Sequence, residues 1–225
     1  MTGNRILDEL PLSAQRVFDK ALVSLAAGDE VLTTGERILY ALFPTTAVCS
    51  LVMQLDSGDK AETATVGRDG FIGVPLVLGR PMSDVSCVVQ VEGEAYRVSA
   101  KTLLDLCKEH EAFRRALFAY SAFRLHLASR TLACNSFHSI LQRMARWLLF
   151  VHDRAGSSDF RLTHERLSAI LAATRPRVSQ AAARLKGEGI IDYHRGTIRI
   201  VDRQRLEAIA CECYGETRRL YPAVL

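Results

Sequence analysis

Basic and amide side chains gather on one face of a predicted helix in the last third of the chain. Its apolar residues Val178, Ala182 and Leu185 recur at i, i+4 and i+7, and Pro176 suits its first turn. Guanidinium groups can bond guanine edges, and a Gln amide can bond an adenine edge, in the major groove of DNA. The residues placed to do this, or to hold phosphates, are Arg175, Arg177, Ser179, Gln180 and Arg184.

A shorter helix precedes this one. Thr163 can cap it, and Leu167, Ile170 and Leu171 fall on one of its faces. Two short helices joined by a tight turn, the second with an Arg- and Gln-bearing outer face, are typical of the helix-turn-helix of DNA-binding proteins. An ordinary helical hairpin with a solvated basic face is the alternative interpretation.

A β-hairpin is predicted directly after the second helix. Its strands lie at 190–193 and 197–201 and are joined through a turn that contains Gly196. This hairpin would form the wing of a winged helix, with Arg195 at its tip. The residues expected to contact the DNA backbone are Thr163, Arg195 and Arg199.

The segment from Leu162 to Ile191 resembles the DNA-binding domain of the Crp/Fnr family of bacterial transcription regulators, and the rest of the chain is similar to that family in the order of its parts. The resemblance implies an α+β fold: a cyclic-nucleotide-binding-like β-roll over 1–110, a dimerisation helix over 111–135 and a winged helix-turn-helix domain over 136–225. It also implies a homodimer that binds double-stranded DNA, with RNA polymerase as a candidate further partner.

In that family a Glu, a Ser or Gly, and an Arg commonly read the bases, and here those positions hold Pro176, Ser179 and Gln180. We therefore assign base reading to Gln180 and Arg177. Arg175 and Arg184 are expected either to read bases or to bind phosphates. Two recognition helices of a twofold dimer should enter successive major grooves, so the operator should be an inverted repeat with half-site centres about 34 Å apart.

The positive charge of the chain is concentrated at its C-terminal end. The net charge is +4 over 225 residues; residues 1–160 hold 17 basic and 18 acidic side chains, whereas residues 161–225 hold 12 and 7. The excess therefore lies in the segment expected to contact phosphates. The sequence shows no nucleophile–base pair, carboxylate dyad or P-loop, so an enzyme is not expected.

The N-terminal part is expected to begin with a short amphipathic helix over 13–25, capped by Ser13. Short apolar segments separated by Gly-containing turns then predict a small barrel or a double-sheet roll. The strands are expected at 31–32, 37–40, 47–55, 61–66, 85–91 and 95–98.

The phosphate-binding cassette of the resembling family falls at 70–73 and, after a short loop, at Val85. In the family it binds an anion through backbone N–H groups, an Arg for the phosphate and a Glu for the ribose hydroxyl. Phe71 takes the Glu position and Val85 the Arg position, so cyclic AMP and cyclic GMP are not expected to bind. Arg68 and Arg80 are nearby in the sequence and could substitute. The candidate effector pocket comprises Gly70, Phe71, Gly73, Val85 and Ser86.

From about 102 to 133 the apolar period becomes helical, and two adjacent stripes suggest contact with two bodies, the roll and a second helix. The stripe expected to form the dimer seam is Phe118, Ala122, Leu125, Ser129 and Leu132. The other stripe is Leu117, Tyr120, Arg124, Leu127 and Thr131. A buried helix in a monomer would show similar stripes.

The pattern is interrupted at 135–136, which is the expected hinge between the domains. A helix over 140–151 should follow and turn its arginines to solvent. These arginines are Arg143, Arg146 and Arg154. After the wing, Asp202 can cap one closing helix that reaches Cys213.

Six cysteines in a chain that shows no signal peptide and no membrane-spanning run indicate free thiols in a reducing cytoplasm. Cys211 and Cys213 form a close pair, but two-residue spacing on a helix turns side chains about 200° apart, so they should not chelate one ion. The segment before the roll, where iron–sulfur members of the resembling family keep most cluster ligands, contains no cysteine. No metal and no cofactor are expected, although a haem, which needs a single His or Cys ligand, is excluded less firmly.

The sequence therefore favours a dimeric, sequence-specific transcription regulator of the Crp/Fnr type. One alternative is a DNA-architectural protein that binds without sequence preference. Another is an effector-binding module that has lost DNA binding. The identity of a small-molecule effector does not follow from the residues, and no membrane partner is expected.

Overall fold

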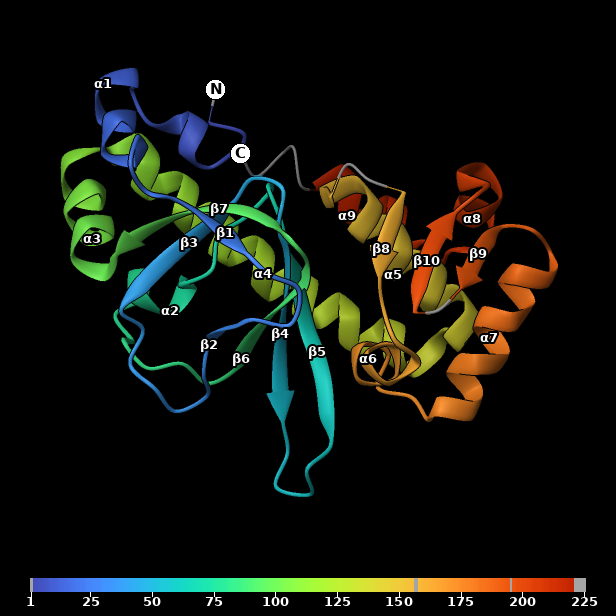
Figure 1. The fold of residues 1–225 in the computed structure, drawn as a ribbon. Coiled ribbons are helices and arrows are strands. Elements are labelled where there is room, and N and C mark those ends of the chain that lie inside the picture. Colours follow the sequence, from blue (N-terminus) through green and yellow to red (C-terminus); the bar gives the residue numbers. More distant parts are fainter. Residues whose placement is uncertain (1, 156–157, 195, 221–225) are drawn as a thin grey trace.

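In the computed structural model the long helix α4 (Glu111–Phe137) runs behind a β-roll towards a winged helix-turn-helix domain (Figure 1). The structure describes residues 2–155, 158–194 and 196–220. The order of parts and the mixed α and β content agree with the predicted fold class. None of the helices in these ranges is both long enough and apolar enough to cross a membrane.

The β-roll consists of two antiparallel sheets, ordered β1-β7-β3 and β2-β6-β4-β5. Its largest core cluster combines aromatic rings such as Phe18, Phe43 and Phe71 with the inner face of α4. The strands are β1 (Leu22–Leu25), β2 (Glu30–Leu32), β3 (Tyr40–Pro44), β4 (Val48–Gln54), β5 (Lys60–Val66), β6 (Ser86–Val91) and β7 (Gly93–Ser99). The helical segments before α4 are η1 (Leu7–Glu9), α1 (Leu12–Gln15), η2 (Arg16–Phe18), α2 (Val74–Val77) and α3 (Ala100–Glu109).

Two predictions about the roll are wrong. The helix expected over 13–25 is replaced by the single turn α1, the 3-10 turn η2 and the strand β1. Leu22 of β1 lies opposite Tyr96 of β7, so the backbone groups of this segment find their partners in the sheet. The strand expected at 37–40 is displaced, because β3 begins at Tyr40. The other expected strands are confirmed within a few residues at their ends.

The two stripes of α4 lie in different surroundings. Leu117, Tyr120 and Leu127 are buried against the roll, and Arg124 and Thr131 are half-buried. Every member of the other stripe is exposed in the isolated chain: Phe118, Ala122, Leu125, Ser129 and Leu132.

The hinge lies further along the chain than predicted. α4 continues through Asn135 and Ser136, because the hydroxyl of Ser136 donates to a backbone carbonyl one turn earlier and is satisfied inside the helix. The chain turns at His138 and Ser139 instead. Ser139 then starts the next helix with a capping box, since its Oγ accepts from Gln142 N at 3.3 Å and its own N–H donates to Gln142 Oε1 at 3.0 Å.

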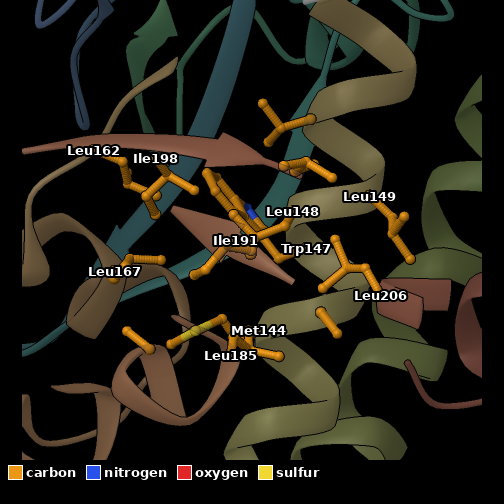
Figure 2. Packing of buried hydrophobic residues seen from close by; sticks show 14 of the residues in the cluster. Met144, Trp147, Leu148, Leu149, Leu162, Leu167, Leu185, Ile191, Ile198 and Leu206 are labelled. Atoms are coloured by element: carbon orange, nitrogen blue, oxygen red, sulfur yellow. The ribbon is translucent and has the colours of Figure 1, made fainter. Parts of the chain in front are cut away.

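In the described residues, the core of the C-terminal domain combines side chains of α5, α6, α7, α8 and α9 with a small sheet ordered β8-β10-β9. The strand β8 had no clear sequence signal. Figure 2 shows the core of the domain, where Met144, Trp147 and Leu148 of α5 meet residues of the other elements. The elements are α5 (Ile140–Ala155), β8 (Asp159–Arg161), α6 (His164–Ile170), α7 (Arg175–Gly187), β9 (Ile191–His194), β10 (Thr197–Ile200), α8 (Arg203–Ile209) and α9 (Cys213–Leu220).

The middle of α5 is buried on all sides, since each residue from 143 to 151 is buried. The prediction that Arg143, Arg146 and Arg154 face solvent is therefore wrong; their exposed fractions are 7%, 8% and 7%. One face of α5 packs on its own domain, and the other faces the roll, whose Val48 belongs to the same hydrophobic cluster. A helix clamped between two bodies has no solvent face left for its arginines.

The closing helix is interrupted. α8 ends at Ile209, the backbone at Ala210 is extended (φ −62°, ψ 149°), and α9 begins at Cys213. Asp202 caps α8 as predicted, since its side chain accepts from Arg205 N at 2.9 Å. The single helix predicted to reach Cys213 is therefore wrong.

Polar contacts join the roll to α5. Arg154 and Asp69 form two hydrogen-bonded contacts, Nη2 to Oδ2 at 2.7 Å and Nε to Oδ1 at 2.9 Å. Trp147 Nε1 donates to Glu62 Oε1 of β5 at 3.0 Å. Both pairs cross the seam between the domains. Because these contacts are directional, they fix the position of α5 along the roll, which apolar packing alone would fix less sharply.

Glu62 should give the stability of the protein a distinct pH dependence. Burial raises its pKa above the usual value of 4.5, and hydrogen bonds from Ser50, Thr65 and Trp147 offset this in part. Between the ordinary pKa of the unfolded chain and the raised folded pKa, the folded state binds a proton that the unfolded state has released. Protonation of Glu62 therefore favours folding increasingly as the pH falls through that window.

We expect the free energy of unfolding of the wild type, relative to Glu62→Gln, to rise as the pH is lowered from neutral towards 4.5 and then to level off. Urea unfolding over a pH series measures this difference, and the variant serves as the reference for all other titrating groups. A relative stability that falls on acidification would show that the pKa of Glu62 is lowered in the folded state.

Candidate nucleic-acid interface

The helix-turn-helix consists of α6, a short connection and α7. Thr163 Oγ1 accepts from Arg166 N at 3.3 Å and caps α6 as predicted. In the connection, Ala172 has φ of +43°, in the left-handed region, which turns the chain without a glycine. Ala173 N–H then donates to Ser168 O at 3.0 Å, which closes the end of α6 and sets the direction in which α7 starts.

α7 has one buried face and one exposed face. Val178, Ala181, Ala182 and Leu185 are buried in the core of the domain. The structure brings the predicted DNA-contacting residues of this helix to the other side, where Arg175, Arg177, Gln180 and Arg184 are exposed and Ser179 is half-buried. α7 lies at the outer edge of the molecule, away from the roll (right of Figure 1).

Two of the arginines already have acidic partners. Arg199 of β10 is exposed and donates to both carboxylate oxygens of Asp159, at 2.6 and 2.9 Å. This pairing lowers the pKa of Asp159 and raises the pKa of Arg199. Arg184 pairs with Glu188 at 2.9 Å. To bind a phosphate, either guanidinium would have to bind it alongside its carboxylate partner or break the ion pair. Arg195, the predicted wing tip, lies outside the described residues.

Sequence reasoning did not identify Lys186 as part of this surface. Its Nζ donates to Tyr193 O at 2.7 Å and pairs with Asp192 at 3.2 Å, so it joins the end of α7 to the strand β9 of the wing. The ion pair lowers the pKa of Asp192. Lys186 lies in the last turn of α7, where a cation is favourable because of the helix dipole. Its position in the sequence therefore gives no sign that it contacts a later strand.

One residue of the candidate effector pocket, Phe71, belongs to the aromatic core of the roll. Phe71 is fully buried; its ring stacks on Phe43 with 5.5 Å between centroids and lies 5.3 Å from the ring of Tyr120 of α4. Gly70 lies so close to Tyr120 that a Cβ there would overlap the phenol. Gly73, with φ of +119°, turns the chain into α2. Position 71 therefore supplies core packing, where the family has a Glu for the ribose.

The second part of the cassette carries no charge. Val85 and Ser86 are half-buried where β6 begins, and the hydroxyls of Ser86 and Thr34 lie 3.3 Å apart. Among the five residues of the candidate effector pocket, a phosphate would find backbone N–H groups and one hydroxyl but no guanidinium.

The loop ahead of the cassette contacts α5 directly. A Cβ on Gly67 would come within 2.7 Å of Arg154 Cβ, and Arg68 Nη2 donates to Asp153 O at 3.2 Å. Asp69 adds its ion pair with Arg154. A cavity of about 330 Å³ opens beside this loop between the two domains, and its charged lining residues are Arg5, Arg68, Asp69, Asp153, Arg154 and Arg218.

A second cluster of reactive side chains lies at the end of α4. The thiols of Cys134, Cys211 and Cys213 and the imidazole of His138 each offer a ligand atom, and these atoms lie within 4.8 Å of one another. The premise that Cys211 and Cys213 share a helix is wrong, because Cys211 precedes α9. The thiols of Cys134 and Cys211 share a hydrogen bond across 3.6 Å, and this contact lowers the pKa of the Cys211 thiol.

Residues 142–209 match the family model of the Crp-like helix-turn-helix domain. This segment belongs to that family. Nearly the whole chain also shares the fold of solved Crp/Fnr structures, which bears out the resemblance seen in the sequence. A search of curated proteins gave no significant match.

Three solved structures illustrate the likeness of fold. A protein of Eubacterium rectale, described as a transcriptional regulator of the Crp/Fnr family, has a TM-score of 0.69 at 15% identity, covering 93% of this chain and 99% of its own. FixK2 of Bradyrhizobium japonicum has a TM-score of 0.67 at 19% identity, covering 84% and 96%. A transcriptional regulator of the CRP family from Thermus thermophilus has a TM-score of 0.70 at 20% identity, also covering 84% and 96%.

Introducing the Crp/Fnr ribose-binding Glu at position 71 should destabilise the protein. Phe71→Glu would remove the ring contacts with Phe43 and Tyr120 and bury a carboxylate in an apolar cluster. We expect the free energy of unfolding to fall by at least about 3–5 kcal/mol, the usual cost of deleting a buried Phe ring. Urea unfolding measures it. Phe71→Leu, which stays apolar, is the matched control and should lose less. Equal stability of Phe71→Glu and wild type would mean that position 71 faces an open, solvated pocket.

Proposed function

We propose that this chain is a homodimeric, sequence-specific transcription regulator that binds DNA in a bacterial cytoplasm. The observation that carries the proposal is the exposed face of α7, where Arg175, Arg177, Gln180 and Arg184 project from a domain of the Crp-like helix-turn-helix family. The direct test is to select bound sequences from a random DNA pool with the purified protein. An inverted repeat should be enriched. A pool that is bound but not enriched would favour a DNA-architectural protein.

The exposed stripe of α4 supports dimerisation. Phe118, Leu125 and Leu132 follow one another at the seven-residue spacing of a coiled coil, and they are 45%, 73% and 71% exposed in the isolated chain. A row of large apolar side chains in water is typical of an interaction surface. The intervening Ala122 and Ser129 are small and would let a second α4 approach closely. Twofold pairing of α4 would also set two copies of α7 side by side for an inverted repeat.

Leu125→Glu should convert the dimer to monomers. It would place two like charges at the centre of the seam and desolvate them, which costs several kcal/mol in association free energy. Because Leu125 is 73% exposed in the isolated chain, the fold of each monomer should be unaffected. Sedimentation velocity measures the change. Leu12→Glu, at a 79% exposed position on α1, is the control and should remain dimeric. A dimeric Leu125→Glu would place the seam elsewhere.

Base reading is assigned to Gln180 and Arg177, which are exposed on α7. Arg175 and Arg184 would read bases or grip phosphates, and Ser179 would lie close to the groove floor between them. Thr163, Arg195 and Arg199 are assigned to the DNA backbone. The hydroxyl of Thr163 already accepts a hydrogen bond as the cap of α6. A phosphate bound at Thr163 would therefore lie at the N-terminus of α6, where backbone N–H groups favour an anion.

Gln180→Ala should weaken binding to the selected operator by about 1–3 kcal/mol and relax the preference at one base pair of each half-site, because a bidentate contact to adenine is lost. Titration of labelled operator and of its single-base variants measures both effects. The matched control is Gln204→Ala, which removes the same side chain from an exposed position on α8. If Gln180→Ala weakens all sequences equally, Gln180 does not read a base.

The roll is proposed not to bind cyclic AMP or cyclic GMP. Phe71 is locked in the core, and Val85 offers no charge for a phosphate. Isothermal titration of either nucleotide should give only heats of dilution, while the same preparation binds its selected operator. Saturable binding at micromolar nucleotide would contradict this. A true effector, where one exists, should be smaller or less charged.

A further inference from the structure

The end of α4 and the α8–α9 connection bring three thiols and one imidazole together. Cys134 and His138 are four residues apart and share one face at the last turn of α4. Cys211 lies in the extended connection and Cys213 is the first residue of α9. The break in the closing helix is what allows both cysteines to point at the same place.

Two of the distances among these atoms match the edges of a metal-centred tetrahedron. Zn–S bonds of about 2.3 Å and Zn–N bonds of about 2.0–2.1 Å place neighbouring ligand atoms roughly 3.5–3.8 Å apart. Cys134 Sγ and Cys211 Sγ are 3.6 Å apart, and Cys213 Sγ and His138 Nδ1 are 3.8 Å apart. All four ligand atoms lie within 4.8 Å of one another.

The imidazole of His138 is oriented as a metal-binding imidazole usually is. Its Nδ1 faces the thiol cluster, while its Nε2 lies 3.1 Å from Glu212 Oε1 on the opposite side of the ring. A carboxylate that accepts from the distal ring nitrogen fixes the tautomer and the ring plane, and leaves the other nitrogen free to bind a cation. Glu212 lies between Cys211 and Cys213 in the sequence. The same short connection therefore supplies two of the thiols and the carboxylate that orients His138.

The charge around the cluster suits bound thiolates. Arg143 and Arg146 are buried, and their positive charges act on Cys134 and Cys211. The Nε atoms of both arginines have no hydrogen-bond partner within the part of the chain that the structure describes. Three thiolates, one neutral imidazole and Zn²⁺ carry a net charge of −1, which would offset part of this buried positive charge.

We propose that Cys134, His138, Cys211 and Cys213 bind one Zn²⁺ ion per chain as a structural centre. On binding, each thiol releases its proton to solvent as its sulfur coordinates the ion, and the imidazole binds in its neutral form. The inference departs from the expectation that the cysteines hold no metal, and it does not depend on the proposed DNA function.

The centre would tie together the two ends of the DNA-binding domain. Cys134 and Cys211 are 77 residues apart in the chain, and α5 to α8 lie between them. A link that closes so long a loop removes much conformational freedom from the unfolded chain. It also anchors the start of α9 on α4, so the domain is held at both its ends. A cavity of about 470 Å³ opens onto the cluster and gives the ion an entry path.

Two other chemistries fit this cluster less well. A disulfide between Cys134 and Cys211, whose sulfurs are 3.6 Å apart, would use two of the four ligand atoms and leave Cys213 and His138 without a role. An iron–sulfur cluster takes thiolates spread around its inorganic core, which four ligand atoms within 4.8 Å of one another would not accommodate.

The experiment measures metal in protein purified without chelator under reducing, anaerobic conditions. Elemental analysis should give one zinc per chain. Replacement by Co²⁺ should give intense visible bands of a tetrahedral ion and near-ultraviolet thiolate-to-cobalt absorption. Cys213→Ser should lose the zinc and the near-ultraviolet intensity, and it should unfold at a lower temperature. Cys107→Ser, which removes a buried cysteine on α3 away from the cluster, is the control and should keep one zinc.

Glu212→Gln tests the site without removing a ligand. Its side chain is 70% exposed, so the fold should be kept, while zinc affinity in a competition titration should fall by about 10–100-fold. Wild-type protein that carries no zinc and shows no thiolate-to-cobalt absorption would overturn the proposal. So would a Cys134–Cys211 disulfide in peptides from the reduced, anaerobic preparation, or iron with acid-labile sulfide in place of zinc.

Discussion

The burial of the middle of α5, residues 143–151, between the two domains is the constraint on which their arrangement depends. A buried helix segment needs partners for the charged groups it carries, and α5 carries three buried arginines. Arg154 is held by Asp69 of the roll, Arg143 reaches a backbone carbonyl at the end of α6, and Arg146 lies near Glu62 of β5. The partners come from different elements. The ion pair of Arg154 with Asp69 crosses the seam, so it ties the position of α5 to the roll; one buried ion without a partner costs more than most apolar contacts contribute.

α4 differs from α5 because only one of its faces is buried within the chain. Its inner face is aromatic and aliphatic, with Tyr120 and Leu127 closing the roll, whereas Leu125 and Leu132 on its outer face have no cover in the isolated chain. The helix is stable as part of the roll, yet it presents an apolar row to water. A second copy of the same row is the simplest cover, since an isologous contact needs one surface only.

Local signals made much of the fold predictable. Thr163 caps α6, and Pro176 lies in the first turn of α7. The apolar spacing of α7 identified its buried face. Each of these effects acts within one or two helical turns. The failures involve partners far away in the chain. Arg154 was expected at the surface because its carboxylate partner is 85 residues distant, and the break at Ala210 involves neither a glycine nor a proline. The cysteine cluster depends on that break, so the sequence alone argued against it.

Control of DNA binding must act on contacts that differ between two arrangements of the domains. The loop at 67–70 is where the roll offers such contacts, since Tyr120 of α4 packs on one side of it and Arg154 of α5 is paired on the other. Loss of that ion pair would leave the buried Arg154 without its carboxylate partner, which is costly. At this loop Phe71 lies in the core, and Val85 carries no charge that could hold a phosphate. The cluster of Cys134, His138, Cys211 and Cys213 joins α4 to the α8–α9 connection, so the C-terminal domain is tied to α4 at both of its ends.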